Sequence, residues 1–327
     1  MRATALDLDP ARYQRNPLHG DSVQWIEKNC YVDVWIELIH ALGCEPLAVV
    51  PVIAQLDFEG DQWTFYKPPH HELGELYGIH VNEMNAWRPM LDHALEHLAA
   101  GKFIAVEADA FWLPDVRGTD YRSNHVKSTI VLVDVDADAR RLRYFHNASF
   151  YELEGEDFEQ TFQLKDTHPA SLPFFAELVR VDRLKHRSAG ELARISAGFL
   201  RWHLAQRPVD NPVDRFAKRF ATELPTLQDK GLNHYHAWAF ATLRQLGSAS
   251  ELMAAYLRWL AASDPDLDAA ALAPAADAYE KISNGAKTFI LKAARAVNSK
   301  KPMETAATFD DWSQAWQTAV TTLDKIR

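Results

Sequence analysis

The spacing of apolar residues along this chain changes near residue 166. Before that point, stretches with helical spacing alternate with short β-branched and aromatic runs, which is typical of a mixed α+β domain. After it, the chain is rich in Ala, Leu and Arg and keeps a helical spacing, with expected breaks at Pro208, Pro212, Pro225, Pro265 and Pro302. We therefore expect an α+β domain over residues 1–165, followed by an all-α bundle of about five to seven helices over residues 166–327.

Composition and motif content exclude several classes of function. The formal net charge of −10 over 327 residues argues against broad, non-specific binding to nucleic acid. The 13 glycines are scattered, so the nucleotide-binding patterns G-x-G-x-x-G and G-x-x-x-x-G-K-[ST] and the hydrolase pattern G-x-S-x-G do not occur. No signal peptide is visible, and no apolar run approaches the ~18 residues of a membrane span. We expect a cytoplasmic protein that contacts neither nucleic acid nor membrane.

Cys30 is the strongest candidate for a reactive residue. It follows Asn29, a favourable N-cap, and opens a run whose apolar residues have helical spacing: Tyr31, Val34, Trp35, Leu38, Ile39 and Leu42. In the first turn of a helix, the free N–H groups and the helix dipole favour a thiolate, so Cys30 is a predicted nucleophile. Cys44 would lie roughly 20 Å further along such a helix. A disulfide needs Cα atoms within about 7 Å, so we expect none.

A cysteine nucleophile needs a base, a group that orients the base, and an oxyanion donor. His125 precedes a β-branched run over residues 126–133, and Asn147 follows a second run over residues 142–145. A hairpin centred on Asp136 would place His125 opposite Asn147, with Cβ atoms ~5 Å apart. Gln24 stands six residues before Cys30, as does the oxyanion glutamine of papain-like enzymes. Three acids of the intervening turn are alternatives to Asn147 or simple turn residues: Asp134, Asp136 and Asp138.

Two further groups of polar residues are candidates for binding. Glu107 and Asp109 follow a predicted strand and share one face, beside Trp112; they could bind a substrate amine or form ordinary salt bridges. A set of basic residues on the expected hairpin could receive an acidic or phosphorylated partner, or form a solvated face: Lys127, Arg140, Arg141 and Arg143. The paired histidines at 70–71 and at 234 and 236 have no companion ligands at zinc spacing, so no metal site is predicted.

Several segments resemble a bacterial family catalogued as a domain of unknown function. They span nearly the whole chain: residues 29–37 (NCYVDVWIE), 57–65 (DFEGDQWTF), 107–114 (EADAFWLP), 144–148 (YFHNA), 207–212 (RPVDNP) and 243–247 (LRQLG). The first half also resembles, more distantly, the N-terminal domain of the butirosin biosynthesis protein H family, acyltransferases with a papain-like cysteine fold. That resemblance implies a papain-like N-terminal domain in which Cys30 is acylated by the phosphopantetheine thioester of a carrier protein. It also implies that His125 is the general base, with Asn147 where an aspartate is common.

The leading hypothesis is a cysteine-dependent acyltransferase that moves an acyl or aminoacyl group from a carrier protein to a small amine. Cys30 attacks the thioester, Gln24 and the Cys30 N–H hold the oxyanion, and His125 with Asn147 manages protons. No cofactor is expected beyond the phosphopantetheine arm of the substrate. A peptidase, amidase or thioesterase could use the same residues with water as acceptor. A non-catalytic module that binds a carrier protein is the third possibility.

Overall fold

The computed structural model describes residues 1–165, 174–264, 267 and 269–325, and it divides into two compact units. The first, called the sheet unit, comprises Met1–Gly20, Asn29–Pro46 and Pro69–Arg187; the second, called the helical unit, comprises Asp21–Lys28, Leu47–Pro68 and Ser188–Arg327. The predicted combination of an α+β first part with a helical second part is confirmed. The expected boundary at residue 166 lies outside the described residues. The sheet unit extends beyond it because the strand Ala176–Arg180 pairs inside the sheet.

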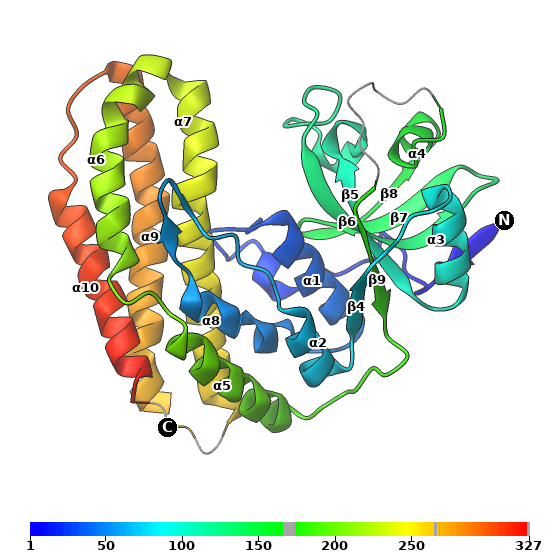
Figure 1. The fold of residues 1–327 in the computed structure, drawn as a ribbon, viewed down its shortest axis with the longest axis horizontal. Coiled ribbons are helices and arrows are strands. Elements are labelled where there is room, and N and C mark those ends of the chain that lie inside the picture. Colours follow the sequence, from blue (N-terminus) through cyan, green and yellow to red (C-terminus); the bar gives the residue numbers. More distant parts are fainter. Residues whose placement is uncertain (166–173, 265–266, 268, 326–327) are drawn as a thin grey trace. The chain divides into compact units, whose positions relative to one another are not determined.

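An antiparallel sheet forms the centre of the sheet unit (Figure 1). Its strands follow the order β4-β9-β5-β6-β7-β8, and β1 pairs with the far end of β6. Their bounds are β1 Arg2–Thr4, β4 His80–Glu83, β5 Phe103–Asp109, β6 Lys127–Asp136, β7 Arg141–His146, β8 Ser149–Glu154 and β9 Ala176–Arg180. The hairpin that the sequence predicts between residues 126 and 145 is confirmed as β6 and β7.

Helices cover both faces of this sheet. On one face, α3 (Met90–Ala99) and α4 (Glu156–Thr161) close an apolar core against alternate residues of β5 and β6, such as Ile104 and Ile130. On the other face, α1 (Cys30–Ala41) contacts β6, β7 and β8. The short helix α2 (His70–Tyr77) leads into β4. Because side chains alternate along a strand, neighbouring residues of β6 point to opposite faces of the sheet, one covered by α3 and α4 and the other by α1.

Helix α1 forms as the sequence predicts. The Asn29 side chain accepts a hydrogen bond from the Val32 N–H at 2.8 Å, which caps the first turn. The apolar residues of the predicted stripe are buried from Tyr31 to Ile39. Two acids of α1, Asp33 and Glu37, are also fully buried, and each faces one ring nitrogen of His19. The N-terminal segment is therefore joined to α1 by paired polar groups inside the unit.

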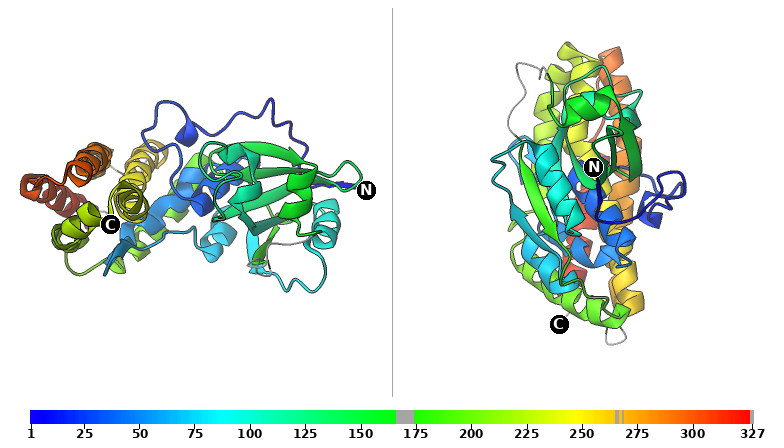
Figure 2. Two further views of the ribbon diagram at one scale, coloured as in Figure 1. Left: turned by 90° about the horizontal axis from the view of Figure 1, so that it is seen from above. Right: turned by 90° about the vertical axis from the view of Figure 1, so that its right-hand side faces the viewer.

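The helical unit is a bundle, which the left view of Figure 2 shows from close to the helix ends. Its helices are α5 Ala189–Ala205, α6 Pro212–Lys230, α7 Leu232–Ala239, α8 Gln245–Ser263, α9 Ala269–Ser299 and α10 Ala306–Leu323, with a π-helical turn at Phe240–Arg244. Segments from the first part of the chain join it: the 3-10 stretch Pro46–Gln55 and the hairpin of β2 (Phe58–Glu59) and β3 (Gln62–Trp63).

The prolines of the second half do not all end helices. Pro212 occupies the first turn of α6, where its missing N–H is harmless. Pro225 was expected to break the helix but lies inside α6, so that expectation is wrong. Phe220 and Leu227, on either side of Pro225, are both fully buried. Their packing stabilises α6 across the position of the proline. Pro265 lies outside the described residues. Within the part of the chain that the structure describes, no helix is long and apolar enough to cross a membrane.

Close packing of α9 against α10 makes Gly285 sensitive to substitution. A Cβ atom at Gly285 would lie 2.2 Å from Nε1 of the buried Trp312. We expect Gly285→Ala to lower the free energy of unfolding by about 1–3 kcal/mol, because the indole ring has to move. In α5, a Cβ at Gly198 meets no atom within 4 Å, so Gly198→Ala is the matched control. It should raise stability by about 0.5–1 kcal/mol through helix propensity. Urea unfolding of both variants measures the difference; equal effects would contradict it.

Burial of His93 in α3 makes stability depend on pH. Neither ring nitrogen has a hydrogen-bond partner among the described residues, and the pKa of His93 is lowered, first by burial and then by Arg88. The unfolded chain therefore binds more protons than the folded chain as the pH falls below about 6.5. We expect the free energy of unfolding to decrease from pH 7 towards pH 5, and to decrease less in His93→Leu. Urea unfolding across this range is the measurement; an unchanged slope in the variant would contradict it.

Candidate active site

Cys30 occupies the first position of α1, on the sheet face that this helix covers. Its Sγ lies 3.9 Å from Oγ1 of Thr129 on β6, and this is its hydrogen-bond contact within the described residues. The thiol is half-buried, and both Cys30 and Cys44 are free cysteines. A thiol at a capped helix N-terminus, beside a hydroxyl group, has the local setting of a nucleophile.

His125 is held by Asp109 and not by Asn147. Its Nδ1 lies 2.6 Å from Oδ2 of Asp109, and its ring stacks on Phe111 with centroids 4.3 Å apart. The pairing of Asp109 with Lys127 brings the end of β5 beside the start of β6, which places the two side chains together. The imidazole is therefore oriented by a carboxylate, as a general base requires. The orienting residue, Asp109, had been predicted from the sequence to bind substrate.

The hairpin register that the sequence suggested is wrong. In the structure Ile130 pairs with His146 and Val131 with Phe145, whereas a hairpin centred on Asp136 would pair His125 with Asn147. The strand β6 runs on through Asp136, which pairs with Arg141, so the turn lies later in the chain. Asn147 has a φ of 44° in the two-residue turn between β7 and β8. The register that was expected to place His125 opposite Asn147 is therefore not formed.

The acids considered as substitutes for Asn147 lie far from His125. Asp134 lies seven residues along β6 from Lys127, where the strand begins, a rise of about 23 Å at ~3.3 Å per residue. It accepts hydrogen bonds from Arg2, at 2.7 Å from Nη2. Asp136 accepts hydrogen bonds from the N–H groups of Ala139 and Asp138, which lower its pKa. Both acids lie near the end of β6 that is remote from His125.

Gln24 belongs to the helical unit, whereas Cys30 belongs to the sheet unit. The Gln24 side-chain amide donates a hydrogen bond to Asn284, and its backbone N–H donates to Oε1 of Glu251 at 2.7 Å. The next residue, Trp25, donates from its indole N–H to Ser283 Oγ at 2.9 Å. The segment 21–28 is therefore bound to α8 and α9. The oxyanion role of Gln24 stays a prediction.

Charged side chains line the sheet face beside Thr129. Glu107 is the β5 partner of Thr129, and its carboxylate forms an ion pair with Lys127 at 2.9 Å. Trp112 lies in the 3-10 turn after β5, with the Arg122 guanidinium 4.3 Å above its ring. Glu107 thus already holds one ammonium group close to the position that Cys30 faces. This arrangement fits the predicted binding of a substrate amine and equally the salt bridge named as its alternative.

The predicted docking residues do not gather in one patch. Lys127 begins β6, whereas Arg140 and Arg141 stand at the turn beyond its other end, about 30 Å away. Each cation also has an acidic partner: Arg140 lies 2.6 Å from Glu159, and Arg141 and Arg143 both face Glu152. Exposed pairs of this kind leave little uncompensated charge. Docking of a carrier protein at these residues stays a prediction.

Two polar clusters in the sheet unit were not predicted from the sequence. In the first, the hydroxyl of Tyr31 donates to Glu177 and accepts from Nε2 of His70, both at 2.8 Å. Burial, and then Glu177, raises the pKa of Tyr31, so the phenol stays protonated. In the second, Ser128, His146 and Asp115 form a chain of hydrogen bonds. Both clusters join residues from separate segments, which spacing along the chain does not reveal.

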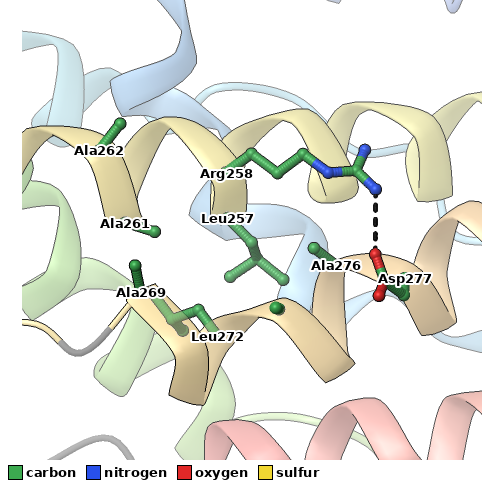
Figure 3. Close-up of a pocket in the computed structure, with 9 residues that line it drawn as sticks. Leu257, Arg258, Ala261, Ala262, Ala269, Leu272, Ala276 and Asp277 are labelled. Atoms are coloured by element: carbon green, nitrogen blue, oxygen red, sulfur yellow. Dashed lines mark hydrogen bonds and ion pairs between the residues drawn. The ribbon is translucent and has the colours of Figure 1, made fainter.

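An apolar cavity of about 230 Å³ lies between α8 and α9 in the helical unit (Figure 3). Leu257 and Leu272 point into it, and Arg258 reaches across to Asp277 at its edge. The residues that line it carry neither a thiol nor an imidazole. Its chemistry therefore does not suggest catalysis. Among the described residues, no group of three or more His, Cys, Asp or Glu side chains is arranged to hold a metal ion.

Two family models match the chain, one after the other. Residues 14–181 match the DUF1839 N-terminal domain, and residues 189–325 match the DUF1839 C-terminal domain. The chain belongs to the DUF1839 family. The predicted membership of a family of unknown function is thereby confirmed. The boundary between the two models lies between residues 181 and 189, and the sheet unit ends in the same stretch, at Arg187. No curated protein matches this DUF1839 chain.

Proposed function

We propose that this DUF1839 protein is a cysteine-dependent acyltransferase. The observation that carries this function is the placement of the Cys30 thiol at the capped N-terminus of α1, 3.9 Å from Thr129 on a sheet face lined by charged groups. A helix that presents a cysteine to an antiparallel sheet is also what a papain-like domain requires. The resemblance to the butirosin biosynthesis protein H family supports a carrier-protein thioester as the acyl donor.

In the proposed reaction, the Cys30 sulfur attacks the thioester carbonyl, and the carbon–sulfur bond to the phosphopantetheine arm breaks. The released thiolate takes up a proton, and the acyl group stays on Cys30. The acceptor, which binds as an ammonium ion, loses one proton; the resulting amine attacks this acyl-enzyme, Cys30 leaves as a thiolate, and the nitrogen gives up a second proton as the amide forms. A thioester is already activated, so the Cys30 thiol at the N-terminus of α1 suffices as the nucleophile of the first step.

The acceptor amine is assigned to Glu107. This carboxylate stands directly across from Thr129 and binds the ammonium group of Lys127. An incoming ammonium group can take the place of Lys127 there, since the charge and the hydrogen bonds are the same. The amine would then enter beside the residue that Cys30 contacts.

His125 remains the proposed base, with Asp109 in place of Asn147 as the group that orients it. Asp109, which holds His125, pairs with Lys127, two residues along the same sheet face from the pair of Glu107 with Thr129, a rise of about 7 Å. If His125 is the base, His125→Ala should lower the rate of acyl transfer roughly 100- to 10,000-fold.

Intact-mass analysis tests the acyl-enzyme. After incubation with an aminoacyl carrier protein, the protein should gain the mass of the acyl group, and Cys30→Ser should not. Cys44→Ser is the matched control, because burial raises the pKa of the Cys44 thiol and leaves it less reactive. Adding amines should then release the acyl group as an amide.

Two other outcomes would show that the protein is not an acyltransferase. Release of the acyl group to water at the same rate with and without amines would identify a thioesterase or amidase. Binding of the carrier protein without any adduct on Cys30 would identify a binding module. An adduct that persists in Cys30→Ser would overturn the assignment of the nucleophile.

A further inference from the structure

A chain of four hydrogen-bonded side chains crosses the other face of the sheet. Ser128 Oγ lies 2.6 Å from His146 Nε2, and His146 Nδ1 lies 2.6 Å from Asp115 Oδ2. The hydroxyl of Tyr144 donates to the remaining oxygen, Asp115 Oδ1, at 2.5 Å. The side chains of His146 and Asp115 are almost completely buried, and Ser128 and Tyr144 are buried residues as well. Ser128 stands at one end of this series of hydrogen bonds, next to His146.

The fold determines this arrangement through the register of two strands. His146 pairs with Ile130, so it stands diagonally across from Ser128 on the same face. Tyr144 lies two residues earlier on β7 and shares that face. Asp115 comes from the 3-10 turn Pro114–Val116, which the sequence places between β5 and β6. Three separate segments thus supply one connected set of groups.

The hydrogen bonds assign a role to each group. Burial, and then Asp115, raises the pKa of Tyr144, so its hydroxyl stays protonated and donates to the carboxylate. The other carboxylate oxygen accepts from the His146 Nδ1–H. Nε2 is then free to accept the Ser128 proton, which is the tautomer that a serine nucleophile needs. A nucleophile within hydrogen-bond reach of a base, with the base held by a carboxylate, is the arrangement of serine hydrolases on unrelated folds.

We propose that Ser128, His146 and Asp115 form a second catalytic site, which hydrolyses small carboxylic esters. Ser128 Oγ attacks the ester carbonyl, its proton passes to His146 Nε2, and the alcohol leaves with that proton as the ester C–O bond breaks. Water then attacks the acyl-serine, gives a proton to His146, and releases the acid as Ser128 takes the proton back. The acyl group must be small, because Ser128 is largely buried and pairs with Ala108 on β5.

This second site does not depend on Cys30. Thr129, which contacts Cys30, and Ser128 are neighbours on β6 and therefore point to opposite faces of the sheet. The two nucleophiles also favour different substrates: the thiolate suits a thioester, and the serine with its base suits an oxygen ester. Their activities can be separated by single substitutions.

The test uses the full chain, a small alkyl fluorophosphonate and p-nitrophenyl acetate. The fluorophosphonate should add one phosphonyl group to the Ser128 peptide: an oxygen–phosphorus bond forms, fluoride leaves, and His146 takes the proton. Ser128→Ala should lack this adduct and lose the part of the p-nitrophenyl acetate turnover that persists in Cys30→Ser. His146→Gln should slow phosphonylation about 100-fold or more. Ser123→Ala is the matched control. Ser123 is exposed, takes no part in the hydrogen bonds among these four side chains, and donates instead to the Thr119 carbonyl.

Peptide mapping of the unsubstituted protein keeps the test independent of whether the variants fold. An adduct on Ser128 that also forms in Cys30→Ser supports the second site. No adduct on Ser128, or equal phosphonylation of His146→Gln with an unchanged melting temperature, would overturn it. In that case the four side chains serve only to hold residues 114–116 on the sheet. Loss of acylation at Cys30 would not affect this result, so the two sites are tested separately.

Discussion

The backbone pairing of β6 with its neighbours is the interaction on which the sheet unit depends. This strand pairs with β5 and β7 along its length and with β1 at its end. A shift of one residue would exchange its two faces. Thr129 would then leave Cys30, and Ser128 would leave His146. Both candidate sites therefore follow from one register.

A second constraint lies under α1. His19, Asp33 and Glu37 are fully buried, and both acids come from the helix that carries Cys30. The Asn16 N–H and the Tyr13 hydroxyl add hydrogen bonds to Glu37, at 3.0 Å and 2.5 Å. Removing one partner from such a group leaves a buried charge without compensation, which is strongly destabilising. The N-terminal segment thus holds the helix in the position from which Cys30 meets β6.

Much of the fold could be predicted from local patterns. The N-cap at Asn29 and the apolar stripe of α1 depend on residues close in sequence, as do the helices of the second half. The hairpin of β6 and β7 was also predictable, but its register was not. The acidic stretch 134–138 resembles a turn, yet Asp134 and Asp136 continue the strand because Arg143 and Arg141 pair with them. Pairing with another strand outweighed the local preference for a turn.

The candidate sites show the same division. The sequence by itself determined that Cys30 begins a capped helix, because capping involves neighbours along the chain. Only the tertiary structure decided that Asp109 orients His125, since that contact needs β5 beside β6. It alone joined Ser128 and His146 to Asp115, and it placed Gln24 and Cys30 in different units. Contacts between distant segments depend on how strands pair, and the spacing of residues along one segment carries no record of that pairing.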